Sequence, residues 1–158
     1  QTFPAASHAP FAVLTQTLPW NIPLIYSGQE EPVLRALPFF EKDSIHWKHF
    51  ARAPFYKTLL ALRKRNPALD ADASFKKITA GDNRAVYAFV RKKLARSVVV
   101  VLNLSPAPQP VQLNLPTPAS GYDVFKHQNV NLNGTKFTLG PWEYRVYEFG
   151  PTRLKENP

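Results

Sequence analysis

Four carboxylates follow an apolar segment near the start of the chain, and carboxylates can act as acids, bases or nucleophiles. They are Glu30, Glu31, Glu41 and Asp43. The apolar residues 22–26 end at Ser27-Gly28, a pattern typical of a buried strand that leads into a loop. We therefore expect a strand over residues 22–26, with Gln29 and Glu30 at its end. Loops in such positions often carry function.

Two helices flank this segment. Residues 9–18 carry apolar side chains at helical spacing, and Pro10 suits a first turn. A second helix is expected to begin near Pro54 and to end before Pro67, because proline cannot continue a helix. Residues 28–49 mix charged and large apolar groups without a sustained period, which predicts a long, partly buried loop.

The pattern changes to short strands after residue 70, which we take as a domain boundary. Strands are expected over residues 74–79, 85–91, 98–102, 111–115, 122–125, 130–132, 135–139 and 143–149. Residues 98–102 are apolar throughout, which predicts a central strand covered on both faces. Asn133-Gly134 predicts a hairpin between the two strands beside it. The sequence thus indicates an all-β domain over residues 71–150, an antiparallel sandwich or Greek key, with a tail at 151–158.

Composition narrows the function classes. The chain has 44% hydrophobic residues, as globular proteins do, and no apolar run of membrane-spanning length. Without Cys it offers no disulfide or thiolate metal site, which leaves the compartment open. It begins at Gln1 and has no Met, so we expect that an upstream part is missing. The four histidines have no metal-ligand spacing and are predicted to lie on the surface: His8, His46, His49 and His127.

The net charge of +9 raises the question of nucleic-acid binding. Its two clusters, residues 63–65 and 91–93, fall at a predicted helix end and at a predicted strand end or turn. No nucleic-acid recognition motif accompanies them. We therefore predict a solvated basic surface, and neither a nucleic acid nor a membrane as partner.

Four segments, in order, resemble the C-terminal end of a family-13 glycoside hydrolase, the α-amylase superfamily. Residues 22–30, I-P-L-I-Y-S-G-Q-E, are similar to the last barrel strand of that family, although Trp20-Asn21-Ile22 replaces the glycine usual before it. Residues 35–47 are similar to the loop that follows, and residues 55–69 to the last barrel helix. Three further stretches look like the C-terminal β domain of that family: residues 86–91, the run V-V-V-V-L-N-L-S and the pattern P-W-x-Y-x-V-Y.

The resemblance implies an α+β fragment: the last αβα portion of a (β/α)8 barrel over residues 1–70, followed by the β-sandwich. It also implies a parent enzyme that hydrolyses α-glucans such as starch or maltodextrin with retention, which needs two carboxylates about 5–5.5 Å apart. In the family the nucleophilic Asp, the acid Glu and a third Asp follow the fourth, fifth and seventh barrel strands, which would lie upstream. We therefore predict no catalytic residue in this chain, which alone should be inactive.

The resemblance also suggests which residues meet the sugar. Predicted rim or substrate-binding residues are Gln29, Glu30, Arg35 and Trp47. The alternative for Gln29 and Glu30 is hydrogen bonding to neighbouring strand ends, and for Arg35 and Trp47 it is loop packing. Trp142 and Tyr144 are candidates for surface sugar stacking, with packing in the sandwich as the alternative. We expect no cofactor in this chain, and the sequence leaves open whether the intact enzyme binds calcium.

Two further expectations concern the chain as a whole. An alternative to the enzyme fragment is a non-catalytic carbohydrate-binding β-sandwich module. A lone barrel strand with unpaired edges is unfavourable in water. Residues 1–50 are therefore expected to be covered by self-association, by the β domain or by a missing N-terminal barrel.

Overall fold

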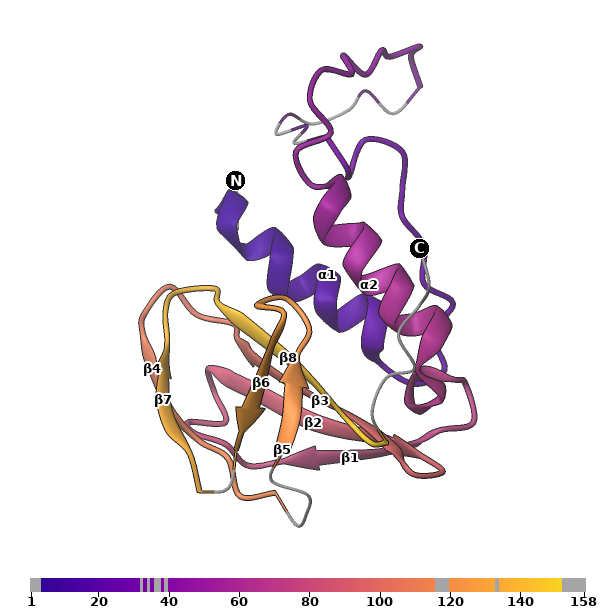
Figure 1. The fold of residues 1–158 in the computed structure, drawn as a ribbon. Helices are drawn as coiled ribbons and strands as arrows, with labels where there is room; N and C mark the ends of the chain where they lie inside the picture. Colours follow the sequence, from indigo (N-terminus) through magenta and orange to yellow (C-terminus); the bar gives the residue numbers. More distant parts are fainter. Residues whose placement is uncertain are drawn as a thin grey trace.

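The computed structural model describes residues 4–31, 33, 35, 38, 40–115, 120–132 and 134–151. Its helices are η1 (Ala5–Ser7), α1 (His8–Thr17), α2 (Ala53–Arg65) and η2 (Pro67–Leu69). Its strands are β1 (Ser74–Ile78), β2 (Val86–Lys93), β3 (Arg96–Asn103), β4 (Gln109–Gln112), β5 (Ser120–Asp123), β6 (Gln128–Asn131), β7 (Lys136–Leu139) and β8 (Tyr144–Phe149). Both predicted helices are confirmed (Figure 1). None of the helices described is long and apolar enough to span a membrane.

The strands form two antiparallel sheets. The larger has the order β1-β2-β3-β8-β5-β6, and β4 pairs only with β7. The predicted hairpin at Asn133-Gly134 is therefore wrong as a strand pairing, although Asn133 itself lies outside the described residues. The strands on its two sides, β6 and β7, belong to different sheets. Because β6 pairs with β5 and β7 pairs with β4, the chain passes from the larger sheet to the smaller one between them.

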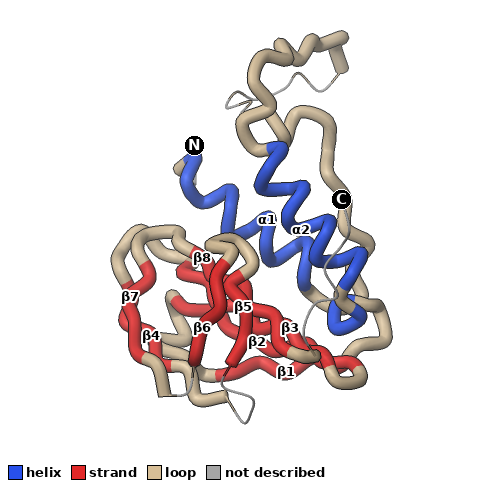
Figure 2. The backbone as a smooth tube through the Cα atoms, in the orientation of Figure 1, coloured by secondary structure: helices blue, strands red, loops and turns tan. Residues whose placement is uncertain are grey.

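The larger sheet is covered on both faces, as the apolar run 98–102 predicts (Figure 2). Val98, Val100 and Leu102 pack with α1 and α2 in one core. Val99 and Val101 pack with β4 and β7 in the other. Along β2 the alternation also holds, with Phe89 toward the helices and Val86 and Ala88 toward β4 and β7. The outcome is an α+β fold dominated by antiparallel sheet, with the two helices packed on one face of the sheet.

The predicted strand at residues 22–26 is wrong in this structure. Residues 21–26 have no regular secondary structure, and Ile22, Leu24 and Tyr26 are 94%, 71% and 64% exposed. A strand of the predicted kind needs neighbouring strands to accept its backbone hydrogen bonds and to cover its side chains. The described part of the chain supplies no such neighbour here. The described residues between 28 and 50 have no helix or strand, and they lie beside the end of α2 that is far from the sheets (Figure 1).

Three basic side chains from the predicted surface clusters instead hold elements of the fold together: Arg91 and Arg65 join the helices to the sheet, and Arg63 joins α2 to α1. Arg91 is fully buried, and its guanidinium donates to the carbonyls of Thr17 (2.9 Å) and Asp70 (2.6 Å). Arg63 donates to the Gln16 carbonyl at 2.9 Å, so two arginines satisfy carbonyls at the end of α1. Burial, with a smaller contribution from the charge of Arg63, lowers the pKa of Arg91. The prediction of a wholly solvated basic surface is therefore wrong.

The third of these side chains, Arg65, ties the end of α2 to the sheet. Its Nη2 lies 2.9 Å from Oε1 of Glu148, a residue of β8 that is 6% exposed. Asn66 donates to the other oxygen of the same carboxylate at 3.2 Å. A buried carboxylate needs such partners, because an unpaired buried charge is costly.

Candidate functional site

Gln29 and Glu30 form local hydrogen bonds that shape the turn at the start of the loop. The backbone N–H of Tyr26 donates to Oε1 of Gln29 at 3.0 Å, and that of Gly28 donates to Oε2 of Glu30 at 3.1 Å. Gly28 has φ 98°, a conformation that favours glycine. Both side chains therefore bind the backbone of their own turn and not neighbouring strand ends, and sugar binding by the two residues stays a prediction.

Glu31 closes the loop, although the sequence analysis did not single it out for this role. Its Oε2 accepts hydrogen bonds from three consecutive backbone N–H groups, those of Lys48 (3.0 Å), His49 (3.0 Å) and Phe50 (2.9 Å). These bonds favour the ionised carboxylate and lower the pKa of Glu31. No local sequence pattern reveals such a contact, because its partners lie 17 to 19 residues away.

The turn held by Glu31 displays two aromatic rings. Trp47 and Phe50 stack with ring centroids 5.2 Å apart and an angle of 15° between the ring planes. The two residues are 43% and 47% exposed. Phe50 has φ 48°, which is unusual for a residue other than glycine, so the turn is held in a strained conformation. Exposed stacked rings on a constrained turn can receive the apolar face of a flat ligand.

Arg35 is engaged within the loop itself. Its guanidinium binds both carboxylate oxygens of Asp43, with Nη2 2.6 Å from Oδ1, and also donates to the Ser44 carbonyl at 3.0 Å. The hydrogen bonds from Arg35 lower the pKa of Asp43. This fork-like pair gives Arg35 a role in loop closure, and its predicted contact with substrate stays a prediction.

Of the four carboxylates noted in the sequence, three make the loop contacts just described: Glu30, Glu31 and Asp43. Glu41 is exposed. The loop thus uses most of its acids to fix its own backbone. The prediction that no catalytic residue lies in this chain is not tested by these contacts.

A small cavity of about 150 Å³ lies beside the loop, and Gln29 lines it together with residues of α1 and α2. On its wall, Nε2 of His8 lies 2.8 Å from the Tyr56 hydroxyl. Burial, together with the charge of Arg52, lowers the pKa of His8. His8 is half-buried, so its predicted surface position is wrong: the helical spacing that buries α1 carries it toward α2. The described residues contain no cluster of three metal-ligating side chains.

Trp142 and Tyr144 lie at the contact between the helices and the sheet. Tyr144 packs edge-on against Phe55 of α2 (5.6 Å between centroids) and Phe125 (4.9 Å). Burial raises the pKa of Tyr144. Trp142 lies 6.5 Å from the Phe11 ring of α1. Both rings thus make packing contacts within the fold, the alternative to sugar stacking, and sugar stacking by the two residues stays a prediction.

We expect the Glu31→Gln change to loosen the turn that carries Trp47 and Phe50. Glutamine keeps an acceptor oxygen but loses the negative charge, so amide hydrogen exchange at residues 48–50 should become roughly three- to tenfold faster at neutral pH. Because the pKa of Glu31 is lowered in the folded protein, Glu31 stabilises the turn fully at pH values above the ordinary pKa range of carboxylates. The contribution is lost as the pH falls through the lowered pKa.

NMR-detected exchange measures this effect residue by residue. Glu41→Gln, on the same loop, is the matched control and should leave these amides unchanged. Equal exchange rates in the wild-type and Glu31→Gln proteins would show that the carboxylate does not hold the turn.

Comparison with known proteins adds a family to this geometry. Residues 77–146 match the family model described as the maltogenic amylase C-terminal domain. A comparison with curated protein sequences gave no match. The predicted resemblance to the C-terminal part of a family-13 α-amylase is thus confirmed, with the sequence match lying in the β domain.

Solved amylase structures share the fold. The noncanonic maltogenic α-amylase AmyB from Thermotoga neapolitana has a TM-score of 0.74 and 17% identity over 93% of this chain and 37% of its own. The E221Q variant of AmyP in complex with maltotriose has a TM-score of 0.69 and 16% identity over 91% of this chain and 34% of its own. AmyP in complex with maltose has a TM-score of 0.69 and 15% identity over 91% of this chain and 34% of its own. The chain therefore spans about a third of the length of these structures.

Proposed function

We propose that this chain, whose residues 77–146 match the maltogenic amylase C-terminal domain, is the C-terminal part of an enzyme that hydrolyses α-glucans such as starch or maltodextrin. That family match is the observation that carries the proposal. The fold likeness supports it, because the likeness covers 93% of this chain and so includes the helices as well as the β domain.

In the proposed parent enzyme, residues 1–70 are the last helix, strand and helix of a (β/α)8 barrel. The exposure of Ile22, Leu24 and Tyr26 supports this, because apolar side chains on an extended segment need a cover. Neighbouring barrel strands from an upstream part of the protein would pair with residues 22–26 and bury them. The catalytic carboxylates, and any calcium site, would then lie upstream as well.

The loop at residues 28–50 would form part of the rim of the active site, since barrel sites lie at the C-terminal ends of the strands. The chain's own contribution is to bind and orient the sugar. Trp47 and Phe50 would receive the apolar face of a glucosyl ring, while Glu31 holds the turn that presents them. The maltose and maltotriose complexes of AmyP support a malto-oligosaccharide as the ligand class.

The test compares the activity of the protein expressed from the intact coding sequence with that of the chain of residues 1–158. The intact protein should release α-anomeric products from maltoheptaose, and the chain alone should release none. NMR detects the products and their anomeric configuration. Loss of stacking in Trp47→Ala should raise KM roughly fivefold with little change in kcat. Trp20→Ala, which removes another exposed indole, is the control. An intact protein without α-glucan hydrolysis, or a purified short chain with it, would refute the proposal.

A further inference from the structure

An apolar groove of about 440 Å³ lies between α2 and the segment of residues 21–26. Ile25 lines it from the segment, and Leu60 and Ala61 line it from α2. Figure 1 shows the segment passing beside α2, and Arg63 of α2 donates to the Asn21 carbonyl at 3.3 Å. We call this hollow the α2 groove.

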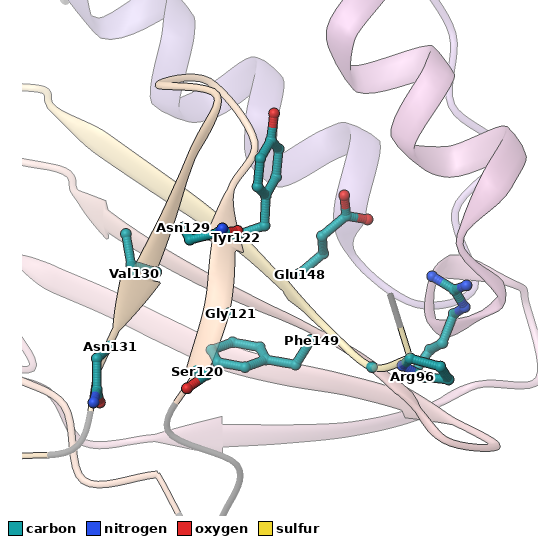
Figure 3. Close-up of a pocket in the computed structure, with 11 residues that line it drawn as sticks. Arg96, Ser120, Gly121, Tyr122, Asn129, Val130, Asn131, Glu148 and Phe149 are labelled. Atoms are coloured by element: carbon teal, nitrogen blue, oxygen red, sulfur yellow. The ribbon is translucent and has the colours of Figure 1, made fainter. Parts of the chain in front are cut away.

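The α2 groove differs from the larger hollow of about 720 Å³ on the β domain (Figure 3). In that hollow the Glu148 carboxylate is bound by Arg65 and Asn66, and the Tyr122 hydroxyl lies 3.4 Å from Nδ1 of His127. The fold itself already uses these polar groups. The α2 groove is mainly apolar, so the occupant that it fits is an apolar surface.

Helical spacing gives the groove a face of α2 to itself. Leu59 and Leu62 are buried in the core that α1, α2 and the sheet share. The groove lies on a different face, formed by exposed residues at positions i, i+3, i+4 and i+7: Lys57, Leu60, Ala61 and Lys64. The second face of α2 is therefore open in the described part of the chain.

The groove adjoins the exposed apolar side chains of residues 22–26. Ile22, Leu24 and Tyr26 are exposed, whereas Pro23 and Ile25 between them are half-buried. This alternation places Ile25 in the groove and its neighbours on the other side of the segment. Contiguous exposed apolar residues of this kind mark an interaction surface, whereas single ones do not.

Two lysines border the groove along α2. Lys57 and Lys64 are exposed and lie about two helical turns apart. Neither has an ion-pair partner among the described residues. Glu30 also lines the groove, and its carboxylate accepts a hydrogen bond from the Gly28 N–H at 3.1 Å. The charge around the groove is therefore positive on balance, which favours an occupant that carries carboxylates.

A second copy of this chain fits the groove poorly. In a symmetric dimer the same surface of both copies forms the interface. Lys57 and Lys64 of one copy would then lie near the same lysines of the other. Because like charges in contact oppose association, the lysines disfavour this occupant.

An upstream part of the same protein fits better. α2 already has one helix as a neighbour, since the Tyr56 hydroxyl lies 2.8 Å from Nε2 of His8 and Arg63 donates to the Gln16 carbonyl at 2.9 Å. In the closed ring of helices around a barrel, each helix has a neighbour on both sides. The likeness to AmyB covers only 37% of that chain, so a protein of that length has room for such a helix.

We propose that the α2 groove holds an amphipathic helix from the upstream part of this protein. Apolar side chains of that helix lie on Ile25 and Leu60, and its carboxylates lie beside Lys57 and Lys64. The small side chain of Ala61 lets the two helices approach closely. The existence of an upstream barrel rests on the proposed function.

Leu60→Ala tests the apolar contact in two proteins, the chain of residues 1–158 and the protein expressed from the intact coding sequence. In the short chain it should change the melting temperature by about 1 °C or less, because Leu60 is 44% exposed there. In the intact protein it should lower the melting temperature by about 3 °C or more, because the docked helix buries the side chain. Leu94→Ala, which also removes an exposed leucine, is the control and should have little effect in either protein.

Carbodiimide cross-linking tests the charge pairing, because it joins a lysine amine to a carboxylate in contact with it. In the intact protein, mass spectrometry should find Lys57 and Lys64 joined to Asp or Glu residues of one upstream helix. Lys92, exposed on the β domain, is the control and should show no link to that helix.

Three results would overturn the inference: links from Lys57 and Lys64 to a second copy, no links from them to upstream carboxylates, or equal effects of Leu60→Ala in the two proteins. Hydrolysis of α-glucan by the intact protein without the upstream links would defeat only this inference. The upstream links and the Leu60→Ala effect without hydrolysis would defeat only the proposed enzyme.

Discussion

Replacing Arg91 with Met is expected to lower the free energy of unfolding by about 3–4 kcal/mol, because it leaves buried carbonyls without donors. The Arg91 side chain is fully buried and donates to the carbonyls of Thr17, Asp70, Ala73 and Ser74. Those carbonyls belong to the end of α1, to the turn after η2 and to the start of β1. Met is apolar and of similar length, so the loss of hydrogen bonds, rather than an empty cavity, accounts for the effect.

Urea unfolding followed by far-UV circular dichroism measures the change. Arg84→Met is the control, because the Arg84 side chain is 91% exposed and its ion pair with Asp82 is of the kind worth about 0–1 kcal/mol. Equal losses in the two variants would contradict the structural role of Arg91. Arg91→Lys should recover only part of the stability, since one ammonium group cannot reach all the carbonyls that the guanidinium fork reaches.

The second large effect is expected for Leu62→Ala in α2, which should lower the free energy of unfolding by about 2–5 kcal/mol. Leu62 is fully buried in the core that joins α1 and α2 to the sheet, with Val13 and Phe89 in the same cluster. Removing its side chain leaves a cavity that a rigid sheet cannot fill. The measurement is again the urea midpoint, together with the near-ultraviolet signal of the aromatic residues around α2.

Leu60→Ala provides a matched control on the same helix, because Leu60 is 44% exposed. Its expected cost is within about 0.5 kcal/mol, as for most surface substitutions. If Leu62→Ala cost no more than Leu60→Ala, α2 would not be packed on the sheet as described. The pair therefore tests whether Leu62 packs α2 onto the sheet.

Elements governed by local periodicity were predicted well. The stripe of α2, the two faces of β2 and the doubly covered β3 all follow from which side chains repeat at helical or strand spacing. The hairpin at Asn133-Gly134 was predicted wrongly, because β6 and β7 belong to different sheets. A turn sequence favours reversal of the chain, but the choice of strand partner depends on burial against residues far along the chain.

The candidate site divides in the same way. The sequence indicated the loop, and Trp47 within it, but not the ring of Phe50 stacked on Trp47 or the Glu31 carboxylate that holds their turn. The sequence also does not show that Tyr122, Asn129 and Glu148 share one face of the sheet, because only the pairing of β5 with β6 and β8 brings them together.

The sequence by itself determined the two helices, most of the strands and the family resemblance, because these depend on side-chain types at short spacing. Only the tertiary structure decided the fate of residues 22–26 and Arg91. An apolar segment becomes a strand only where neighbours accept its hydrogen bonds, and here residues 21–26 are irregular and largely exposed. A basic residue becomes a core residue only where distant carbonyls converge on it, as they do on Arg91.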